Sequence, residues 1–222
     1  AGQPIIALDE TAARTNDRQL VLRLVRLESI NARLDAEQAE RDEIVFPDML
    51  MNLRTDREIA DIIDSQRLNF KGSRLKLKSD LQLLRSNIEA LRFRSEGYAS
   101  QQKSMERQLV LLKEELKAKN SLANQGLIRR TELNALSRAI ADAEGQIGRL
   151  GAEVSEANAE ISKYERQISQ TRAAYSQSAL DEMQKISAEL DSVREQQRSA
   201  ANVLKRATID APVSGVVVRL HY

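Results

Sequence analysis

Few residues of this chain have the type and spacing needed for chemistry on a substrate. The only histidine, His221, is next to the end of the 222-residue sequence, so neither a catalytic triad nor a histidine-based metal site can form around it. The chain has no cysteine, which excludes thiolate zinc sites and thiol catalysis. Paired carboxylates such as Glu114 and Glu115 lack a concave apolar pocket. The sequence therefore predicts no enzyme activity, no catalytic or metal-binding residue and no cofactor.

Two other groups of residues are candidates for binding. Gly145, Gly148 and Gly151 lie three residues apart on one helical stripe, where they would either let a neighbouring helix approach closely or simply be tolerated on a solvated face. No predicted strand precedes them, so they do not form a phosphate-binding loop. Arg129 and Arg130 make a mildly basic cluster, but 34 basic residues against 33 acidic ones argue against nucleic acid as a partner.

Long helices must position these residues. No proline occurs between Pro47 and Pro212, and a proline inside a helix costs about 3 kcal/mol or more. The composition, with 41% hydrophobic, 30% charged and only 3% aromatic residues, is typical of a coiled coil. A first helix is expected at about residues 10–44, with Asp9 as a plausible N-cap and an end at Phe46-Pro47. Its apolar face holds Leu20, Leu24, Leu27 and Leu34.

A heptad pattern predicts two further helices. The second helix, at about residues 55–124, should begin at a capping box formed by Thr55 and Glu58. Its seam alternates steps of four and three, and ten of its twelve positions are apolar: Leu77, Leu81, Leu84, Ile88, Leu91, Ser95, Tyr98, Gln102, Met105, Leu109, Leu112 and Leu116. The third helix, at about residues 130–205, continues the seam at Leu133, Leu136, Ile140, Ala143, Ile147, Leu150, Val154, Ala157, Ile161, Tyr164, Ile168, Thr171 and Tyr175.

Together these patterns predict a mainly α fold with a long antiparallel coiled-coil hairpin. Gly126 should adopt the left-handed conformation at the turn, which spans about residues 122–133. Because the second and third helices nearly match in length, the first helix is surplus and should pack beside the base of the hairpin. Beyond Ser178 the apolar pattern is displaced by one residue, as expected where the partner surface changes.

The two ends of the chain read as strands of one small β domain. Ile5 to Leu8 follows a turn signal, and the segment 208–218 alternates strand-forming residues around Pro212 and Gly215. We therefore predict a split β domain from residues 1–9 and 206–222, with the helical domain, residues 10–205, inserted between its halves. In this arrangement Val213, Val216 and Val218 should pack near Ile5 and Leu8.

These ends and the turn resemble a known family. The Ala-Pro-Val-Ser-Gly-Val-Val segment at residues 211–217, beside the start at residues 1–9, resembles the two half-motifs of the lipoyl-like domain in HlyD-like membrane fusion proteins. The resemblance is closest to adaptors of type I exporters for proteases and lipases. Leu122 and Leu133 match the two leucines of a tip pattern found in many efflux adaptors. Ala118, Arg129 and Asn134 depart from that pattern, which affects the choice of outer-membrane partner.

The resemblance implies a function. Members of the family form a periplasmic ring, of about six copies, that bridges an inner-membrane ABC transporter and a TolC-like outer-membrane channel. It implies a full-length protein anchored in the inner membrane of a Gram-negative bacterium, and no swinging cofactor. The partner-binding residues would lie at the hairpin tip: Leu122, Gly126, Leu127, Ile128, Arg129 and Leu133.

A second reading of the chain is a cytosolic coiled-coil spacer or scaffold protein. No window approaches the roughly 20 apolar residues that span a bilayer. The chain begins at Ala1 without a methionine and ends at Tyr222 just after a strand-like run has started, so we expect it to be a fragment, with any membrane anchor outside it. The adaptor reading predicts that the two ends of the chain meet and pair, whereas the spacer reading makes them incidental. An upstream transmembrane segment in the full-length protein would also separate the two readings.

Overall fold

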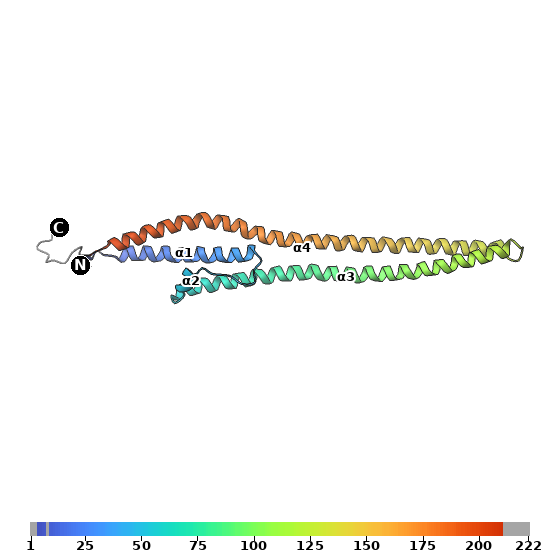
Figure 1. Cartoon of the computed structure of the whole chain (residues 1–222), viewed down its shortest axis with the longest axis horizontal. Helices are drawn as coiled ribbons and strands as arrows, with labels where there is room; N and C mark the ends of the chain where they lie inside the picture. Colours follow the sequence, from blue (N-terminus) through green and yellow to red (C-terminus); the bar gives the residue numbers. More distant parts are fainter. Residues whose placement is uncertain (1–3, 8, 211–222) are drawn as a thin grey trace. The chain divides into compact units, whose positions relative to one another are not determined.

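The computed structural model describes residues 4–7 and 9–210, which fall into two compact units. Unit 1 combines residues 1–77 with residues 173–222, and unit 2 consists of residues 78–172. Figure 1 labels the elements, which follow one another as β1 (Pro4–Ala7), α1 (Thr11–Gln38), α2 (Asp48–Asn52), α3 (Arg57–Ala123), α4 (Arg130–Arg206) and β2 (Thr208–Asp210). The fold is mainly helical, as predicted, and α3 and α4 lie within two residues of their expected bounds.

The start of α1 lies within one residue of the prediction, but the prediction of its end at residue 44 was wrong. At the start, the N-cap is Glu10 and not Asp9 as predicted, although the carboxylate of Asp9 accepts a hydrogen bond from the backbone N–H of Thr11. At the other end α1 stops at Gln38, because Glu40 adopts a left-handed conformation with φ of 48°. The backbone N–H of Arg41 then bonds to Ala36 O at 2.9 Å, which closes a Schellman motif. Glutamate is uncommon in this conformation, so the sequence pattern does not reveal the stop.

The cap of α3 also differs from the prediction. The helix begins at Arg57, and Asp56 rather than Thr55 supplies the capping oxygen. Asp56 Oδ1 accepts the backbone N–H of Glu58 at 3.0 Å, a bond typical of an acidic N-cap. The same carboxylate forms an ion pair with Arg18 of α1 at 2.6 Å, so the cap also joins two helices.

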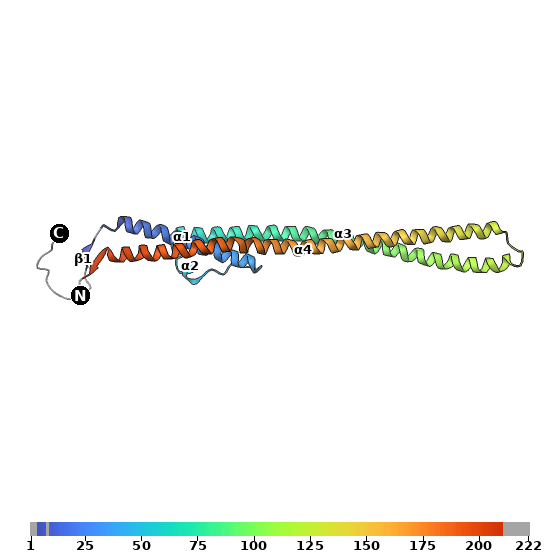
Figure 2. The same cartoon turned by 90° about the horizontal axis from the view of Figure 1, so that it is seen from above.

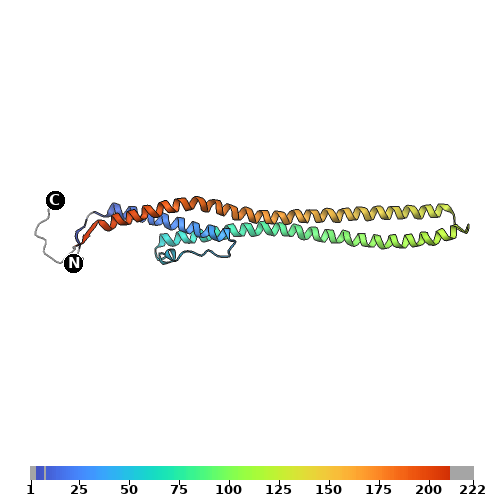
Figure 3. The same ribbon diagram turned by 45° about the horizontal axis from the view of Figure 1, so that its top comes forward.

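Unit 1 contains α1, the short α2, the first turns of α3 and the last turns of α4. Figures 1 and 3 show α1 between the first turns of α3 and the last turns of α4. One core cluster joins α1 to α2 and α3 through Val25, Ala32, Phe46, Leu50, Ile59 and Ile63. A second cluster joins α1 to α4 through Leu27, Leu190 and Val193. The prediction that the first helix packs beside the base is therefore confirmed.

The strands near the two chain ends pair with each other. β1 and β2 are antiparallel, with Ile6 opposite Ile209 and Ala7 opposite Thr208. The expectation that the ends meet is confirmed for these residues, while Val213, Val216 and Val218 lie outside the described part of the chain. The lipoyl-like character of the ends, and the division into a split domain and an inserted domain, stay predictions.

Unit 2 is an antiparallel helical hairpin. Figure 2 shows the later part of α3 and the earlier part of α4 joined by the turn. Every predicted seam position in this unit is buried or half-buried, so the heptad assignment is confirmed. Contacts across the seam include Ser95 Oγ to Asn158 Oδ1 at 3.2 Å and Lys113 to Glu144 at 2.7 Å. Among the described residues, no helix has the length and apolar character needed to cross a bilayer.

Candidate partner-binding site at the hairpin turn

The turn between α3 and α4 is stabilised by a second Schellman motif. Gly126 has a φ of 77°, which an L-residue with a side chain rarely adopts, and this confirms the left-handed glycine. Its N–H bonds to Ala123 O at 2.9 Å, and the N–H of Leu127 bonds to Leu122 O at 3.1 Å. These bonds satisfy the last carbonyls of α3, so the turn has a defined backbone that can present side chains to a partner.

Apolar side chains are exposed at this turn. Leu127 is 69% exposed and Leu122 is 42% exposed, whereas Ile128 and Leu133 are half-buried. Two helices that end together cannot enclose the residues that join them, so this apolar surface stays in contact with water. Burial against another protein would remove it from water, at about 25 cal/mol per Å².

Two exposed arginines give the turn a local positive charge. Arg129 and Arg130 are exposed, and within the described residues neither forms an ion pair. Lys119 instead pairs with Glu115 at 2.9 Å, and this hydrogen bond raises the pKa of the lysine. An acidic or hydrogen-bond-accepting surface on a partner would complement the two free guanidinium groups.

The structure brings the predicted site residues together. Five of them lie at the end of α3 or in the connection to α4: Leu122, Gly126, Leu127, Ile128 and Arg129. The sixth, Leu133, lies one helical turn into α4. Ala118 and Asn134, which depart from the adaptor tip pattern, are both exposed. In the described part of the chain, no group of three or more histidine, cysteine, aspartate or glutamate residues is placed to hold a metal ion. The exposed leucines and unpaired guanidinium groups of the turn give it the chemistry to bind the surface of another protein.

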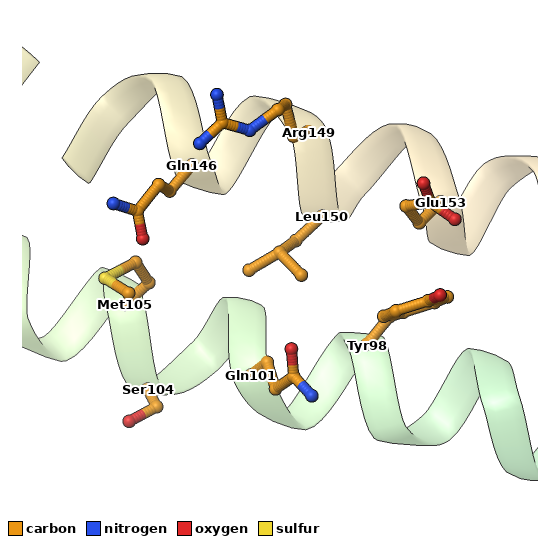
Figure 4. Close-up of a pocket in the computed structure, with 8 residues that line it drawn as sticks. All are labelled: Tyr98, Gln101, Ser104, Met105, Gln146, Arg149, Leu150 and Glu153. Carbon is orange, nitrogen blue, oxygen red and sulfur yellow. The ribbon is translucent and has the colours of Figure 1, made fainter. Parts of the chain in front are cut away.

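A hollow in the middle of unit 2 was not predicted from the sequence. Its volume is about 480 Å³, and its lining residues come from both helices: Tyr98, Gln101, Ser104, Met105, Gln146, Arg149, Leu150 and Glu153. Figure 4 shows Leu150 pointing from α4 toward α3. Glu153 forms an ion pair with Arg94 at 3.4 Å, and Arg94 lies over the Tyr98 ring at 5.6 Å. Three of the lining residues, Tyr98, Met105 and Leu150, are seam positions.

Comparison with known proteins links this geometry to one kind of protein. The family model described as "AprE, long alpha-helical hairpin" matches residues 13–203. The chain is 29% identical over 220 residues to the type I secretion system membrane fusion protein PrsE of Rhizobium meliloti, covering 99% of this chain and 50% of PrsE. It is 28% identical to the proteases secretion protein PrtE of Dickeya chrysanthemi, covering 98% of this chain and 49% of PrtE. The chain thus spans about half the length of these curated relatives.

Solved structures share the fold. The soluble domain of LipC, a membrane fusion protein of a type I secretion system, matches with a TM-score of 0.88 over 96% of this chain and 80% of LipC. The periplasmic adaptor protein EmrA matches with a TM-score of 0.50 over 100% of this chain and 59% of EmrA. Both are 20% identical in sequence, so these matches concern the fold alone.

Proposed function

The chain belongs to the AprE long alpha-helical hairpin family, and from this premise we propose that it is the hairpin part of a periplasmic adaptor in a type I secretion system. The adaptor would bridge an inner-membrane ABC transporter and a TolC-like outer-membrane channel and so support protein export. The observation that carries the proposal is the family match over residues 13–203, in a chain whose hairpin turn exposes apolar side chains.

The turn is the proposed docking site for the channel. Leu122 and Leu127 supply exposed apolar surface, and Arg129 supplies an unpaired charge at the same turn. Ile128 and Leu133 are half-buried near the same turn, and Gly126 sets the path of its backbone. An end-on contact between helices needs little more than such a surface on a well-formed turn. The role is one of binding, with no catalytic step and no cofactor.

The paired ends of the chain support the rest of the proposal. The antiparallel pairing of β1 with β2 brings residues 4–7 beside residues 208–210, as a split lipoyl-like domain requires. A self-associated ring of about six copies would surround the export path. We place the protein in the periplasm of a Gram-negative bacterium, with its inner-membrane anchor outside the 222 residues.

The alternative of a cytosolic coiled-coil spacer has less support. It gives no reason for the strand pairing near the chain ends, and the relatives that match over nearly the whole chain carry the names of secretion proteins. A full-length protein that fractionates with the cytosol and has no transmembrane segment would favour the spacer.

Secretion measurements test the proposed docking site. The double variant Leu127→Asp, Arg129→Glu changes exposed side chains, so helicity and protein level should stay normal while export of the cognate substrate stops. A charge reversal at Glu160, which is exposed in the middle of unit 2, is the matched control and should leave export unchanged. Export at the wild-type rate by the double variant would remove the turn as the docking site.

A further inference from the structure

The outer face of α3 in unit 2 carries an unusual line of uncharged residues. The face opposite the seam of a coiled coil normally meets water and is charged or polar. Here every seventh residue from Leu83 onward is exposed and uncharged: Leu83, Ala90, Gly97, Ser104, Leu111 and Ala118. Phe93 lies beside this line, and its side chain is 68% exposed. We call these seven residues the α3 stripe.

The outer face of α4 in unit 2 also carries uncharged lines of residues, and their side chains are small. Two neighbouring lines of exposed residues run along it: Ala141, Gly148, Ser155 and Ser162 in one, and Gly145, Ala152 and Ala159 in the other. We call these seven residues the α4 stripe. Between residues 130 and 172 no large hydrophobic side chain is exposed, whereas the α3 stripe has three. Space is open around the Cβ positions of Gly145 and Gly148. A flat, small surface of this kind can accept bulky side chains from a neighbouring helix.

The two stripes lie on opposite sides of the hairpin. Taking Leu81 and Leu84 as the first and fourth positions of a heptad, the main line of the α3 stripe occupies the third position. By the same numbering, Ala141 and Gly148 occupy the second position in α4. Antiparallel pairing places second positions of both helices on one flank and third positions on the other. The large apolar side chains of the α3 stripe therefore lie on one flank and the small side chains of the α4 stripe on the other, which suits a head-to-tail contact between copies.

One charged residue at an end of the α4 stripe is complementary to the outer face of α3. Arg138 lies in line with Gly145 at heptad spacing. From the contacts of Lys113 with Glu144 and Ser95 with Asn158, Glu114 of α3 lies at about the level of Arg138.

Both charged side chains are exposed. Within the described part of the chain, neither has an ion-pair partner. Two copies at the same height would bring Glu114 of one copy close to Arg138 of the next.

We infer that hairpins of this protein pack side by side, with the α3 stripe of one copy on the α4 stripe of the next. At equal height, Phe93 of one copy meets the region of Ala159 in its neighbour, and Leu111 meets the region of Gly145. The inference rests on the self-association included in the proposed function, and it specifies the two surfaces that make contact. Because the surfaces differ, the contact repeats in one direction, and a constant rotation between copies would close it into a ring.

Cross-linking in the full-length protein tests this contact. The 222 residues contain no cysteine, so an introduced thiol is the only one in this part of the protein. Cells that make both a Phe93→Cys and an Ala159→Cys variant should yield a cross-linked dimer with a short bis-maleimide reagent, and a chain with both changes should yield a ladder of multimers. Phe93→Cys alone and Ala159→Cys alone should not cross-link to themselves. Glu160→Cys replaces Ala159→Cys in the control, and it should give no product with Phe93→Cys.

The cross-linking and secretion results distinguish the proposed contact from its alternatives. Self-cross-linking of Phe93→Cys would overturn the inference in favour of a symmetric α3-to-α3 pair, and absence of the mixed product would overturn it altogether. Normal secretion without the mixed product would reject this interface and leave the adaptor function intact. Loss of secretion by the turn variants with the mixed product retained would confirm the interface separately from channel docking.

A charge swap gives a second readout. Glu114→Arg should lower the mixed Phe93→Cys and Ala159→Cys product by roughly fivefold, as expected for one exposed ion pair. Adding Arg138→Glu to the same chain should restore the product, because the opposite charges are then exchanged between the copies. A reduction without restoration would overturn the predicted pairing of these two residues.

Discussion

Unit 1 and unit 2 use the same kind of helix but bury their residues to different extents. In unit 1, Leu34, Leu50 and Ile63 are fully buried. In unit 2, the seam residue Leu84 is 8% exposed, and Leu91 and Leu150 are only half-buried. The difference follows from the number of helices, because a third helix covers the flanks that a two-helix seam leaves open to water. Unit 1 thus has the more completely buried core, while unit 2 leaves more of its helix surface exposed.

The largest effect is expected from truncating the core of unit 1. Leu34→Ala should destabilise unit 1 by about 4 kcal/mol, since a fully buried leucine leaves a cavity that its neighbours cannot fill. The matched control, Leu20→Ala on the half-buried part of the same helix, should cost much less. Urea unfolding followed by circular dichroism measures both. Equal effects of the two changes would contradict the burial difference.

A smaller effect is expected for the seam of unit 2. Leu84→Ala should cost about 2 to 3 kcal/mol, and Ile147→Ala less than Leu84→Ala because Ile147 is half-buried. Thermal unfolding combined with hydrogen exchange localises these losses to unit 2. If Leu84→Asp left unfolding unchanged, the seam assignment would fail.

The ion pair between Glu28 and Arg194 tests the polar part of unit 1. Glu28 of α1 is buried, and Arg194 of α4 approaches its Oε1 at 2.6 Å. Arg194→Ala should cost about 1 to 3 kcal/mol, because it leaves a buried carboxylate without its partner. Arg198→Ala, which removes an exposed pair with Glu195, should change the unfolding midpoint very little.

Substitution of Gly126 should destabilise only the structure near the turn. Gly126→Val forces a branched side chain into a left-handed conformation, at a cost of about 1 to 2 kcal/mol. Hydrogen exchange should accelerate at residues near the turn while unit 1 stays protected. Gly97→Ala, inside α3, is the control and should be neutral or stabilising, because nothing lies within 4 Å of its Cβ position.

The smallest expected effect concerns the cap of α3. The hydrogen bond from Arg18 lowers the pKa of Asp56 below its ordinary value of 3.8. A carboxylate with a lowered folded-state pKa stabilises the fold above its unfolded pKa, and this contribution disappears as the pH falls through the folded pKa. Arg18→Ala should therefore raise the Asp56 pKa toward 3.8 in an NMR titration. An unchanged pKa would show that Arg18 does not contact Asp56 in solution.

Sequence reasoning succeeded where local chemistry decides the structure. The heptad spacing identified the seam residues from Leu77 to Tyr175, since a stripe at this period has to face a partner helix. Gly126 identified the turn, because glycine adopts a left-handed conformation without a steric penalty. The exposed Leu127 beside it followed from the same turn, so most of the candidate site could be predicted, although its role in docking stays a proposal.

The sequence by itself determined the long helices, their seam and the turn, since periodicity and a single glycine act over a few residues. The tertiary structure alone decided how α1 is used. Its end at Gln38 and its buried Glu28, Ser29 and Glu37 have no counterpart in a one-faced amphipathic pattern. The polar residues are buried because α1 lies between α3 and α4, and the partner of Glu28, Arg194, is distant in sequence.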